Sequence, residues 1–261
     1  MDFEQICQLM AAAEREAAEL VMHAHNILSE TKSGSRDVVT EYDRRVQQFL
    51  EEKMRQSIPN AHFFCEELGE REDLHSEHMF IIDPIDGTMN FVRGFNHSCI
   101  SMAYAHEGEV CAACVYNPYM DEMFTAVKGR GAYLNGKRLT IQDRPLSDSV
   151  VCFGTSPYYQ ELTDITFAIT KEAFKAALDL RREASAELDL CSVAASRAGI
   201  FFELRLSMWD YAAGALIISE AGGRCCTIEG EALPYDGSAS SVAAGYPSAL
   251  EEFLRIAKTC Q

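Results

Sequence analysis

The 261-residue sequence lacks the features that mark several large protein classes. No apolar run approaches the roughly 20 residues that a membrane-spanning helix needs. The first five residues include Asp2 and Glu4 and no basic residue, so they lack the basic start of a signal peptide. Neither the complete P-loop pattern G-x-x-x-x-G-K-[ST] nor the nucleophile pattern G-x-S-x-G is present. We therefore expect a soluble, cytoplasmic protein that uses neither of these phosphate-binding or nucleophilic devices.

Basic residues are scarce: 23 Lys and Arg stand against 40 Asp and Glu, for a net charge of −17. Such an acidic surface repels nucleic-acid phosphates and anionic lipids, so we expect neither nucleic acid nor membrane as a partner. A small phosphorylated substrate would also be repelled unless cations lay in its site. The charge is thus a small argument for bound metals, although it could serve solubility alone.

The ten cysteines lack the spacing of a zinc site. Cys111 and Cys114 form a C-x-x-C pair, but no second such pair and no well-spaced His pair accompanies it. Residues 110–116 read as a strand, on which positions three apart face opposite sides of the sheet. We predict free, buried thiols that pack in the core rather than a redox or zinc site.

The apolar pattern divides the chain into two kinds of region. The first half combines two helices with antiparallel strand signals, and the second half alternates strands and helices, which predicts an α+β part joined to an α/β part. We place the boundary near residues 141–147, giving subdomains 1–143 and 144–261. The predicted helices cover 3–28, 40–54, 161–177, 185–197, 210–221 and from 248. The predicted strands cover 61–64, 79–82, 98–104, 109–116, 122–126, 132–134, 150–153, 200–203, 224–228 and 241–244.

Two turns and one helix start have clear local signals. Glu107-Gly108 and Asn135-Gly136 predict tight hairpin turns. Thr40 and Asp43 have the spacing of a capping box and predict the start of the second helix.

Carboxylates follow an apolar strand in the stretch from Asp83 through Pro84 to Asp86. Carboxylates in a turn at the end of a strand can converge on one point, and Mg²⁺ prefers oxygen ligands. Gly87 and Thr88 come next, and a helical turn beginning there could offer free N–H groups to a phosphate. The alternative is an Asx turn in which Asp86 only caps a helix.

Two more acidic positions join this pattern. Glu66 and Glu67 close the strand that precedes the Asp83 strand, where the alternative is a solvated turn. Trp209-Asp210 opens an otherwise apolar helix, where Asp210 could be a simple N-cap.

In combination these motifs closely resemble those of the inositol monophosphatase family. The resemblance rests on Glu66, on Asp83-Pro-Ile-Asp-Gly-Thr88, and on Trp209-Asp210 followed by Glu220-Ala-Gly-Gly223. The stretches 37–43 and 128–136 are similar to two further motifs of the family. The resemblance spans nearly the whole chain. It implies a layered α-β-α-β-α sandwich of the sugar-phosphatase type. It also implies a Mg²⁺-dependent, Li⁺-sensitive phosphatase that forms a homodimer.

The resemblance also implies metal ligands. Glu66, Asp83 and the carbonyl of Ile85 should hold one Mg²⁺, and Asp83, Asp86 and Asp210 a second. A third, weaker ion near Glu66 would bring the number to three.

Further roles are carried over in the same way. Thr88 and Asp43 should position or deprotonate the attacking water, and Glu66 belongs to the same catalytic set. Gly87 and Thr88 should bind phosphate through their N–H groups. Glu203 should contact substrate hydroxyls. Ala186 and Asp210 complete the predicted substrate contacts.

One departure leaves the substrate open. The family usually has G-S-A-A before the helix predicted at 185–197, whereas this chain reads Ala184-Ser-Ala-Glu187. An inositol monophosphate or a related polyol phosphate is the leading substrate. Fructose bisphosphate, histidinol phosphate, NADP and 3′-phosphoadenosine 5′-phosphate are alternatives within the fold. A non-catalytic regulatory protein that binds metal or phosphate is the alternative of another class. His97 lies near the Asp83 motif, and we expect it to be structural.

Overall fold

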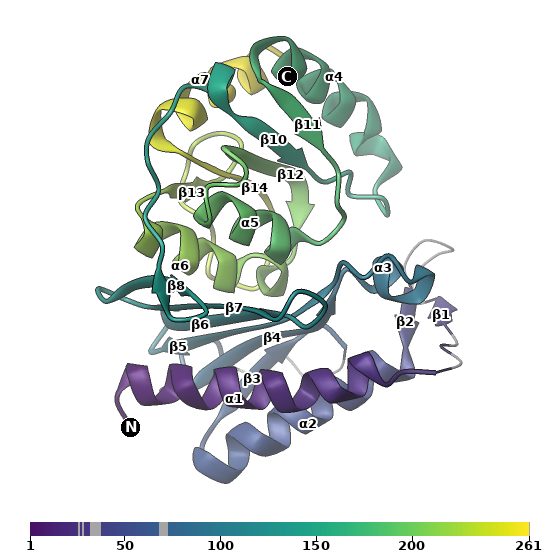
Figure 1. Ribbon diagram of the computed structural model, residues 1–261, viewed down its shortest axis with the longest axis vertical. Helices are drawn as coiled ribbons and strands as arrows, with labels where there is room; N and C mark the ends of the chain where they lie inside the picture. The colour runs from purple at the N-terminus through teal and green to yellow at the C-terminus, as the bar shows by residue number, and fades with distance from the viewer. Residues whose placement is uncertain (26, 28, 32–37, 68–72, 261) are drawn as a thin grey trace.

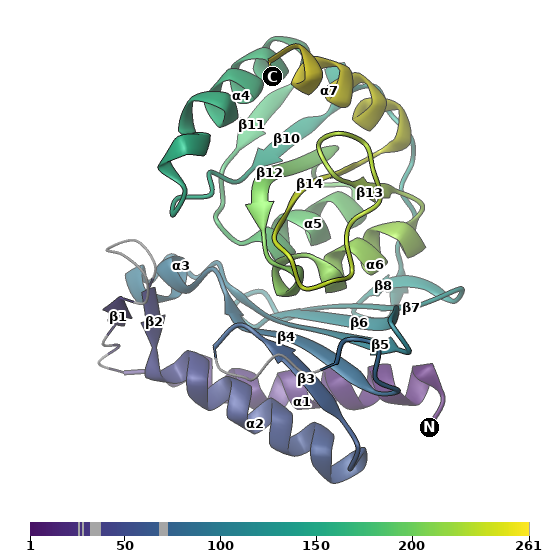
Figure 2. The same cartoon turned by 180° about the vertical axis from the view of Figure 1, so that it is seen from behind.

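The chain folds into five stacked layers of helices and sheets (Figure 1). The computed structural model describes residues 1–25, 27, 29–31, 38–67 and 73–260. Within these residues the layers are α1 with α2, a seven-stranded sheet, α5 with α6, a five-stranded sheet, and α4 with α7 (Figures 1 and 2). The predicted α-β-α-β-α sandwich is therefore confirmed. The longer helices are α1 (Phe3–Met22), α2 (Glu41–Ser57), α4 (Thr163–Ala176), α5 (Ala186–Ala194), α6 (Ala212–Ala221) and α7 (Pro247–Cys260).

The first sheet is antiparallel except at one edge, where β3 and β4 run parallel. Its strands lie side by side in chain order. The outer face is covered by α1 and α2, whose buried stripes include Met10 and Leu50. The strands are β3 (His62–Cys65), β4 (Met79–Asp86), β5 (Cys99–His106), β6 (Glu109–Asn117), β7 (Glu122–Val127), β8 (Gly131–Leu134) and β9 (Lys137–Arg138).

The second sheet has the order β11-β10-β12-β14-β13. Strands β11, β10 and β12 are parallel, β14 is antiparallel to β12, and β13 is antiparallel to β14. The chain crosses between the sheets in residues 139–149, and the division at residues 143 and 144 stays a prediction. The strands are β10 (Val150–Phe153), β11 (Asp179–Arg181), β12 (Ile200–Leu206), β13 (Arg224–Cys226) and β14 (Ser240–Gly245).

The middle layer is buried on both sides. In α5, residues 186–191 are all buried, and α6 buries most of its length against the first sheet and α5. A helix enclosed in this way is apolar around most of its surface. Any charged side chain that α5 or α6 carries therefore needs a specific partner. Within the described residues, no helix combines the length and the apolar character that crossing a membrane requires.

The two turns and the capping box are confirmed. Both residues of each turn have positive φ, 51° and 86° at Glu107-Gly108 and 48° and 77° at Asn135-Gly136. The Thr40 side chain caps α2, and the Asp43 carboxylate accepts a hydrogen bond from the Thr40 N–H.

The first helix is shorter than predicted. It ends at Met22 and not near residue 28, and a short strand, β1 (Ser29–Thr31), pairs with β2 (Val38–Thr40). The Tyr42 hydroxyl accepts from the His25 N–H at 3.0 Å and donates to the His25 carbonyl at 3.2 Å. These tertiary bonds hold the His25 backbone away from helical pairing. Residues 32–37 lie outside the described residues, and with them Lys32, which could lie near the site, and Asp37 of the stretch 37–43.

The orientation predicted for the C-x-x-C pair was wrong. Tyr104 pairs with Ala112 and the next residue, Ala105, pairs with Val110, so Cys111 is an extra residue in β6. This bulge turns Cys111 to the same side as Cys114, and both pack in the cluster beneath α1. The prediction of free thiols is confirmed, since all ten cysteines are unbridged.

Candidate active site

Asp83 and Asp86 lie at the end of β4, where the strand pairing becomes irregular. Residues three apart on a regular strand face opposite sides. Asp83 pairs with Ser101 and Asp86 with Cys99, and the register with β5 shifts between them. Pro84 has no N–H to offer to the ladder, which fits a break at this point. Asp86 is among the charges that raise the pKa of Asp83, so the two carboxylates share one environment.

Glu66 reaches the same region from the neighbouring strand. Strands β3 and β4 are parallel, with Cys65 opposite Ile82. The Glu66 N–H continues the ladder by donating to the Ile82 carbonyl at 3.2 Å. This register places Glu66 beside Asp83 at the carboxyl end of both strands.

Asp210 arrives from the other half of the chain. It ends a 3-10 turn (Met208–Asp210), and α6 begins only at Ala212, so the predicted start of that helix was two residues early. The Asp210 Oδ2 accepts from the Ser207 N–H at 2.6 Å. The Trp209 ring lies 5.2 Å from that of Phe64 in β3, which anchors the turn to the first sheet.

These acidic groups disturb one another strongly. Burial raises the pKa of Asp83 well above its usual value, and Glu66, Asp86, Asp210 and Asp43 raise it further. Burial also raises the pKa of Asp210, followed by the charges of Glu66 and Asp86. Among the described residues, no three His, Cys, Asp or Glu side chains are already arranged to hold a metal ion. The carboxylates therefore surround a common region without closing on one point, and a cation there would relieve their repulsion.

Thr88 and Asp43 form a hydrogen-bonded pair beside these acids. The Asp43 Oδ2 accepts from the Thr40 N–H at 2.8 Å and from the Thr40 hydroxyl at 2.5 Å. Its other oxygen, Oδ1, lies 3.3 Å from the Thr88 hydroxyl. The capping box of α2 thus fixes the carboxylate and leaves one oxygen directed at Thr88.

Gly87 occupies a position that only glycine fits. Its φ is +85°, and an added Cβ would lie 3.1 Å from the carbonyl oxygens of both Ala184 and His97. Gly87 caps α3 (Thr88–Arg93) and has no side chain to occupy the first N–H groups of that helix. The N–H groups predicted to bind phosphate, those of Gly87 and Thr88, lie at this helix start.

Asp86 is held by the start of α5. Its Oδ2 accepts from the Ser185 hydroxyl at 2.6 Å and from the Glu187 N–H at 2.8 Å, and its Oδ1 accepts from the Ala186 N–H at 3.2 Å. The chain enters this cradle through Ala184, whose φ of +63° is a left-handed conformation. The backbone of Ala186 therefore faces a predicted metal ligand, and its contact with substrate stays a prediction.

The Glu187 side chain bonds to the start of a neighbouring helix. It is completely buried, and its Oε2 accepts from the Gly214 N–H at 2.7 Å. Gly214 lies in the first turn of α6, whose own N-cap residue makes no side-chain bond. Burial raises the pKa of Glu187 to about 8, and the nearby Asp86 contributes. The departure at this position thus supplies a cap for α6.

Glu203 lies in β12 and is held by the segment after β10. Its Oε1 accepts from the Ser156 N–H at 2.6 Å and from the Ser156 hydroxyl at 3.2 Å. Its Oε2 lies directly over Gly154, since a Cβ there would be 1.7 Å away. Burial raises the pKa of Glu203 to about 7, although the Ser156 bonds and Arg182 act in the opposite direction.

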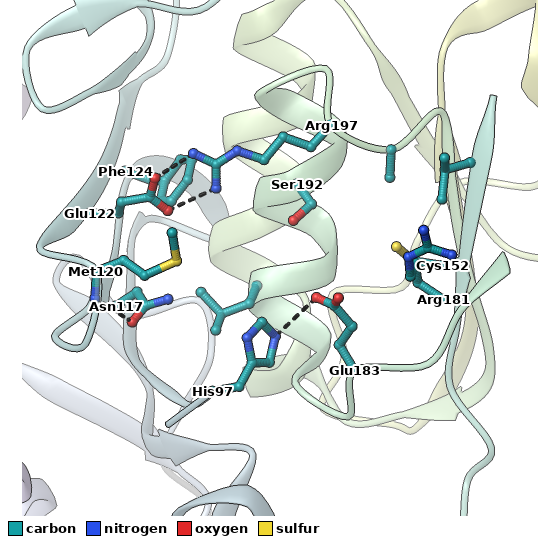
Figure 3. A pocket seen from close by; sticks show the side chains of 13 residues that line it. His97, Asn117, Met120, Glu122, Phe124, Cys152, Arg181, Glu183, Ser192 and Arg197 are labelled. Carbon is teal, nitrogen blue, oxygen red and sulfur yellow. Dashed lines mark hydrogen bonds and ion pairs between the residues drawn. The ribbon is translucent and has the colours of Figure 1, made fainter. Parts of the chain in front are cut away.

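A separate cavity of about 370 Å³ runs along α5 (Figure 3). Residues of both sheets line it, and none of the predicted site residues does. Its charged groups are paired: His97 Nε2 lies 3.3 Å from Glu183 Oε2, and Arg197 bonds to Glu122 (Figure 3). The Asn90 amide donates to the backbone carbonyls of His97 and Glu183, which joins these two segments just before Ser185. The structural role of His97 stays a prediction.

Several polar residues of the site had no signal in the sequence. Ser185, Ser156 and Ser207 each hold a predicted site carboxylate, but each is far from its partner along the chain or sits in an unremarkable turn. The family motifs also touch each other: the Glu220 carboxylate accepts from the N–H groups of Gly129 and Gly131, both at 2.7 Å.

Comparison with known proteins shows the family of this chain. A model of the inositol monophosphatase family matches residues 2–261. The chain belongs to the inositol monophosphatase family. An inositol-1-monophosphatase of Rhizobium meliloti is 38% identical over 213 residues, covering 81% of this chain and 79% of the relative. A relative named putative Nus factor SuhB, from Neisseria meningitidis serogroup B, is 36% identical and covers 94% of each chain.

The fold of this family member agrees with solved structures as well. The crystal structure of the extragenic suppressor protein SuhB from Bartonella henselae superimposes with a TM-score of 0.89 at 30% identity. It covers 96% of this chain and 97% of its own. The similarity therefore includes both sheets and all three helix layers.

Proposed function

We propose that the protein is a Mg²⁺-dependent phosphatase that hydrolyses the phosphate monoester of a small polyol. The observation that carries this proposal is the Thr88–Asp43 pair placed beside four mutually repelling carboxylates, Glu66, Asp83, Asp86 and Asp210. A hydroxyl held by a buried carboxylate can orient a water, and the carboxylates can hold the cations that phosphate requires. Membership of the inositol monophosphatase family supports the same reaction.

The donor set fits Mg²⁺, which takes oxygen ligands. Glu66, Asp83 and the Ile85 carbonyl would hold one ion, and Asp83, Asp86 and Asp210 a second. A third near Glu66 is part of the proposal. Bound Mg²⁺ lowers the pKa of water and neutralises phosphate charge.

The remaining steps use the chain's own groups. Asp43 holds the Thr88 hydroxyl so that its lone pairs accept a hydrogen from the attacking water and orient it. The N–H groups of Gly87 and Thr88 bind the phosphate oxygens. Glu203 accepts hydrogen bonds from hydroxyls of the alcohol, and Ala186 and Asp210 complete the substrate contacts. Glu66 acts with Thr88 and Asp43 in positioning water.

The proposed partners follow the same reasoning. The substrate is a small phosphorylated alcohol, the protein forms a homodimer as the family resemblance implies, and we expect no nucleic-acid or membrane partner. Inositol monophosphate leads, with fructose bisphosphate, histidinol phosphate, NADP and 3′-phosphoadenosine 5′-phosphate as same-fold alternatives. A regulatory protein is the alternative of another class, because the Neisseria meningitidis relative is named as a factor and not as an enzyme.

Phosphate release from this substrate panel tests the proposal. We expect turnover with Mg²⁺, none with EDTA, and inhibition by Li⁺. Asp86→Asn should abolish turnover, whereas Asp164→Asn on the exposed side of α4 should not. Full turnover by Asp86→Asn would refute the metal assignment, and no turnover on any panel member would favour the regulatory alternative.

A further inference from the structure

Three parallel strands bring separate polar segments to one edge of the second sheet. Strands β11, β10 and β12 lie side by side and run in the same direction. Arg182 directly follows β11, and Thr155 and Ser156 follow β10. Glu203 and Arg205 lie toward the end of β12. Ligands of sheets with this arrangement bind at the carboxyl ends of the parallel strands.

Hydrogen bonds connect these segments around Glu203. The Ser156 hydroxyl donates to the Glu203 Oε1 at 3.2 Å and can also reach the Arg205 carbonyl at 3.3 Å. The Arg182 Nη2 donates to the Thr155 hydroxyl at 3.1 Å. Arg182 is also near enough to lower the pKa of Glu203, in opposition to burial. Arg182 therefore lies near the carboxylate proposed to bind the alcohol, and the backbone of Arg205 contacts the same Ser156 hydroxyl.

Neither arginine is neutralised by a close carboxylate. Both side chains are exposed, and within the described part of the chain neither forms an ion pair. Arg205 lies over the Tyr159 ring, 4.3 Å from its centre, which restricts the guanidinium without using its charge. Arg182 uses one of its five N–H donors on Thr155.

Nearby arginines behave differently. Arg181 pairs with Asp179, and Arg197 pairs with Glu122. In a chain with 40 acidic and 23 basic residues, carboxylate partners are plentiful. Arg182 and Arg205 form no ion pair among the described residues, and both contact the segment 155–159 that holds Glu203. They are therefore available to an anion, since guanidinium groups bind carboxylate and phosphate through two parallel hydrogen bonds.

We propose that Arg182 and Arg205 form an anion site at the alcohol end of the active site, so that the preferred substrate carries a second anionic group. This inference rests on the proposed phosphatase function. The phosphate that is hydrolysed lies at Thr88, and the second group, a phosphate or a carboxylate, pairs with the two guanidinium groups. A polyol phosphate with no other charge, such as inositol 1-phosphate, leaves both arginines without a partner.

Matched substrate pairs test this proposal with Mg²⁺. Fructose 1,6-bisphosphate is compared with fructose 1-phosphate for a second phosphate, and 3-phosphoglycerate with glycerol 3-phosphate for a carboxylate. We expect the wild-type kcat/KM to favour the doubly anionic member of at least one pair by about tenfold or more, which corresponds to ~1.4 kcal/mol. The double variant Arg182→Ala/Arg205→Ala should lose this preference, chiefly through KM. The neighbouring, ion-paired Arg181→Ala is the control and should keep it.

Two outcomes would overturn the anion site: a wild type without preference in either pair, or a double variant that keeps the wild-type ratio. Failure of the proposed function is distinguishable, because then no member of either pair is hydrolysed. In that case the anion site is tested by binding instead of turnover. The affinities of the protein for fructose 1,6-bisphosphate and for fructose 1-phosphate are measured by calorimetric titration in EDTA. Tighter binding of the bisphosphate that disappears in the double variant supports the site, and equal binding refutes it.

Discussion

The Thr88 hydroxyl lies 3.3 Å from the Asp43 Oδ1 and 3.1 Å from the Ile85 carbonyl oxygen. Thr88 and Asp43 are 45 positions apart in the chain. Asp43 is fixed by Thr40 at the start of α2, and Thr88 begins α3 directly after the carboxylates of β4. A helix cap and a strand end thus combine to hold one hydroxyl at the proposed site of water attack.

Thr88→Ala should therefore lower kcat by roughly 10²–10⁴-fold with little change in KM, the range for loss of a proton-transfer group. Thr88→Ser keeps the hydroxyl and should restore most of the activity. Steady-state kinetics with Mg²⁺ check both variants. If Thr88→Ala turned over as fast as the wild type, Thr88 would have no part in the reaction.

Ala184→Gly should stabilise the protein. Ala184 has φ of +63°, a left-handed conformation that costs a residue with a Cβ about 1 kcal/mol and costs glycine little. Thermal unfolding should show a higher Tm for the variant. Ala11→Gly, within α1, is the control and should lower the stability by about 0.5–1 kcal/mol. A lower Tm for Ala184→Gly would show that this conformation is not strained.

Glu187→Ala should destabilise the protein by about 1–3 kcal/mol, because the buried Gly214 N–H would lose its acceptor. Glu187→Gln keeps an acceptor oxygen and should be considerably more stable than the alanine variant. Urea unfolding measures both. Equal stability of the two variants would show that the bond to Gly214 contributes nothing to folding.

Glu203 should make the stability depend on pH. Its pKa is about 7 in the folded protein against 4.5 in an unfolded chain, so the folded state binds the proton more tightly. The resulting stability is complete below pH 4.5 and is lost as the pH rises through 7, roughly 3 kcal/mol in total. Glu203→Gln should remove this part of the slope in urea unfolding between pH 4.5 and 8. An unchanged slope would contradict the raised pKa.

Gly154→Ala should displace the Glu203 carboxylate, because the new Cβ would overlap its Oε2. We expect KM for a polyol phosphate to rise more than kcat falls. The change should have little further effect in a Glu203→Ala background, since the overlapping group is then absent. Additive effects in this double-mutant cycle would show that Gly154 acts independently of Glu203.

Much of the fold was predictable because its signals are local. The Thr40–Asp43 capping box and the two hairpin turns each depend on residues within a few positions of one another. Most strands of both sheets also follow from their apolar pattern, whereas the short, charged β9 was not predicted. The end of α1 was missed because the bonds that decide it come from Tyr42, on another helix.

The sequence by itself determined the order of elements, the carboxylates that follow the strands, and the family to which they point. Tertiary structure decided that Glu66, Asp83, Asp86 and Asp210 share one environment, through strand register and the packing of Trp209 on Phe64. It also decided that Glu187 caps α6 and that Arg182 and Arg205 both contact the segment 155–159 that holds Glu203. These relationships join positions that are distant in the chain, and only the packing of the five layers brings them within hydrogen-bonding or electrostatic range.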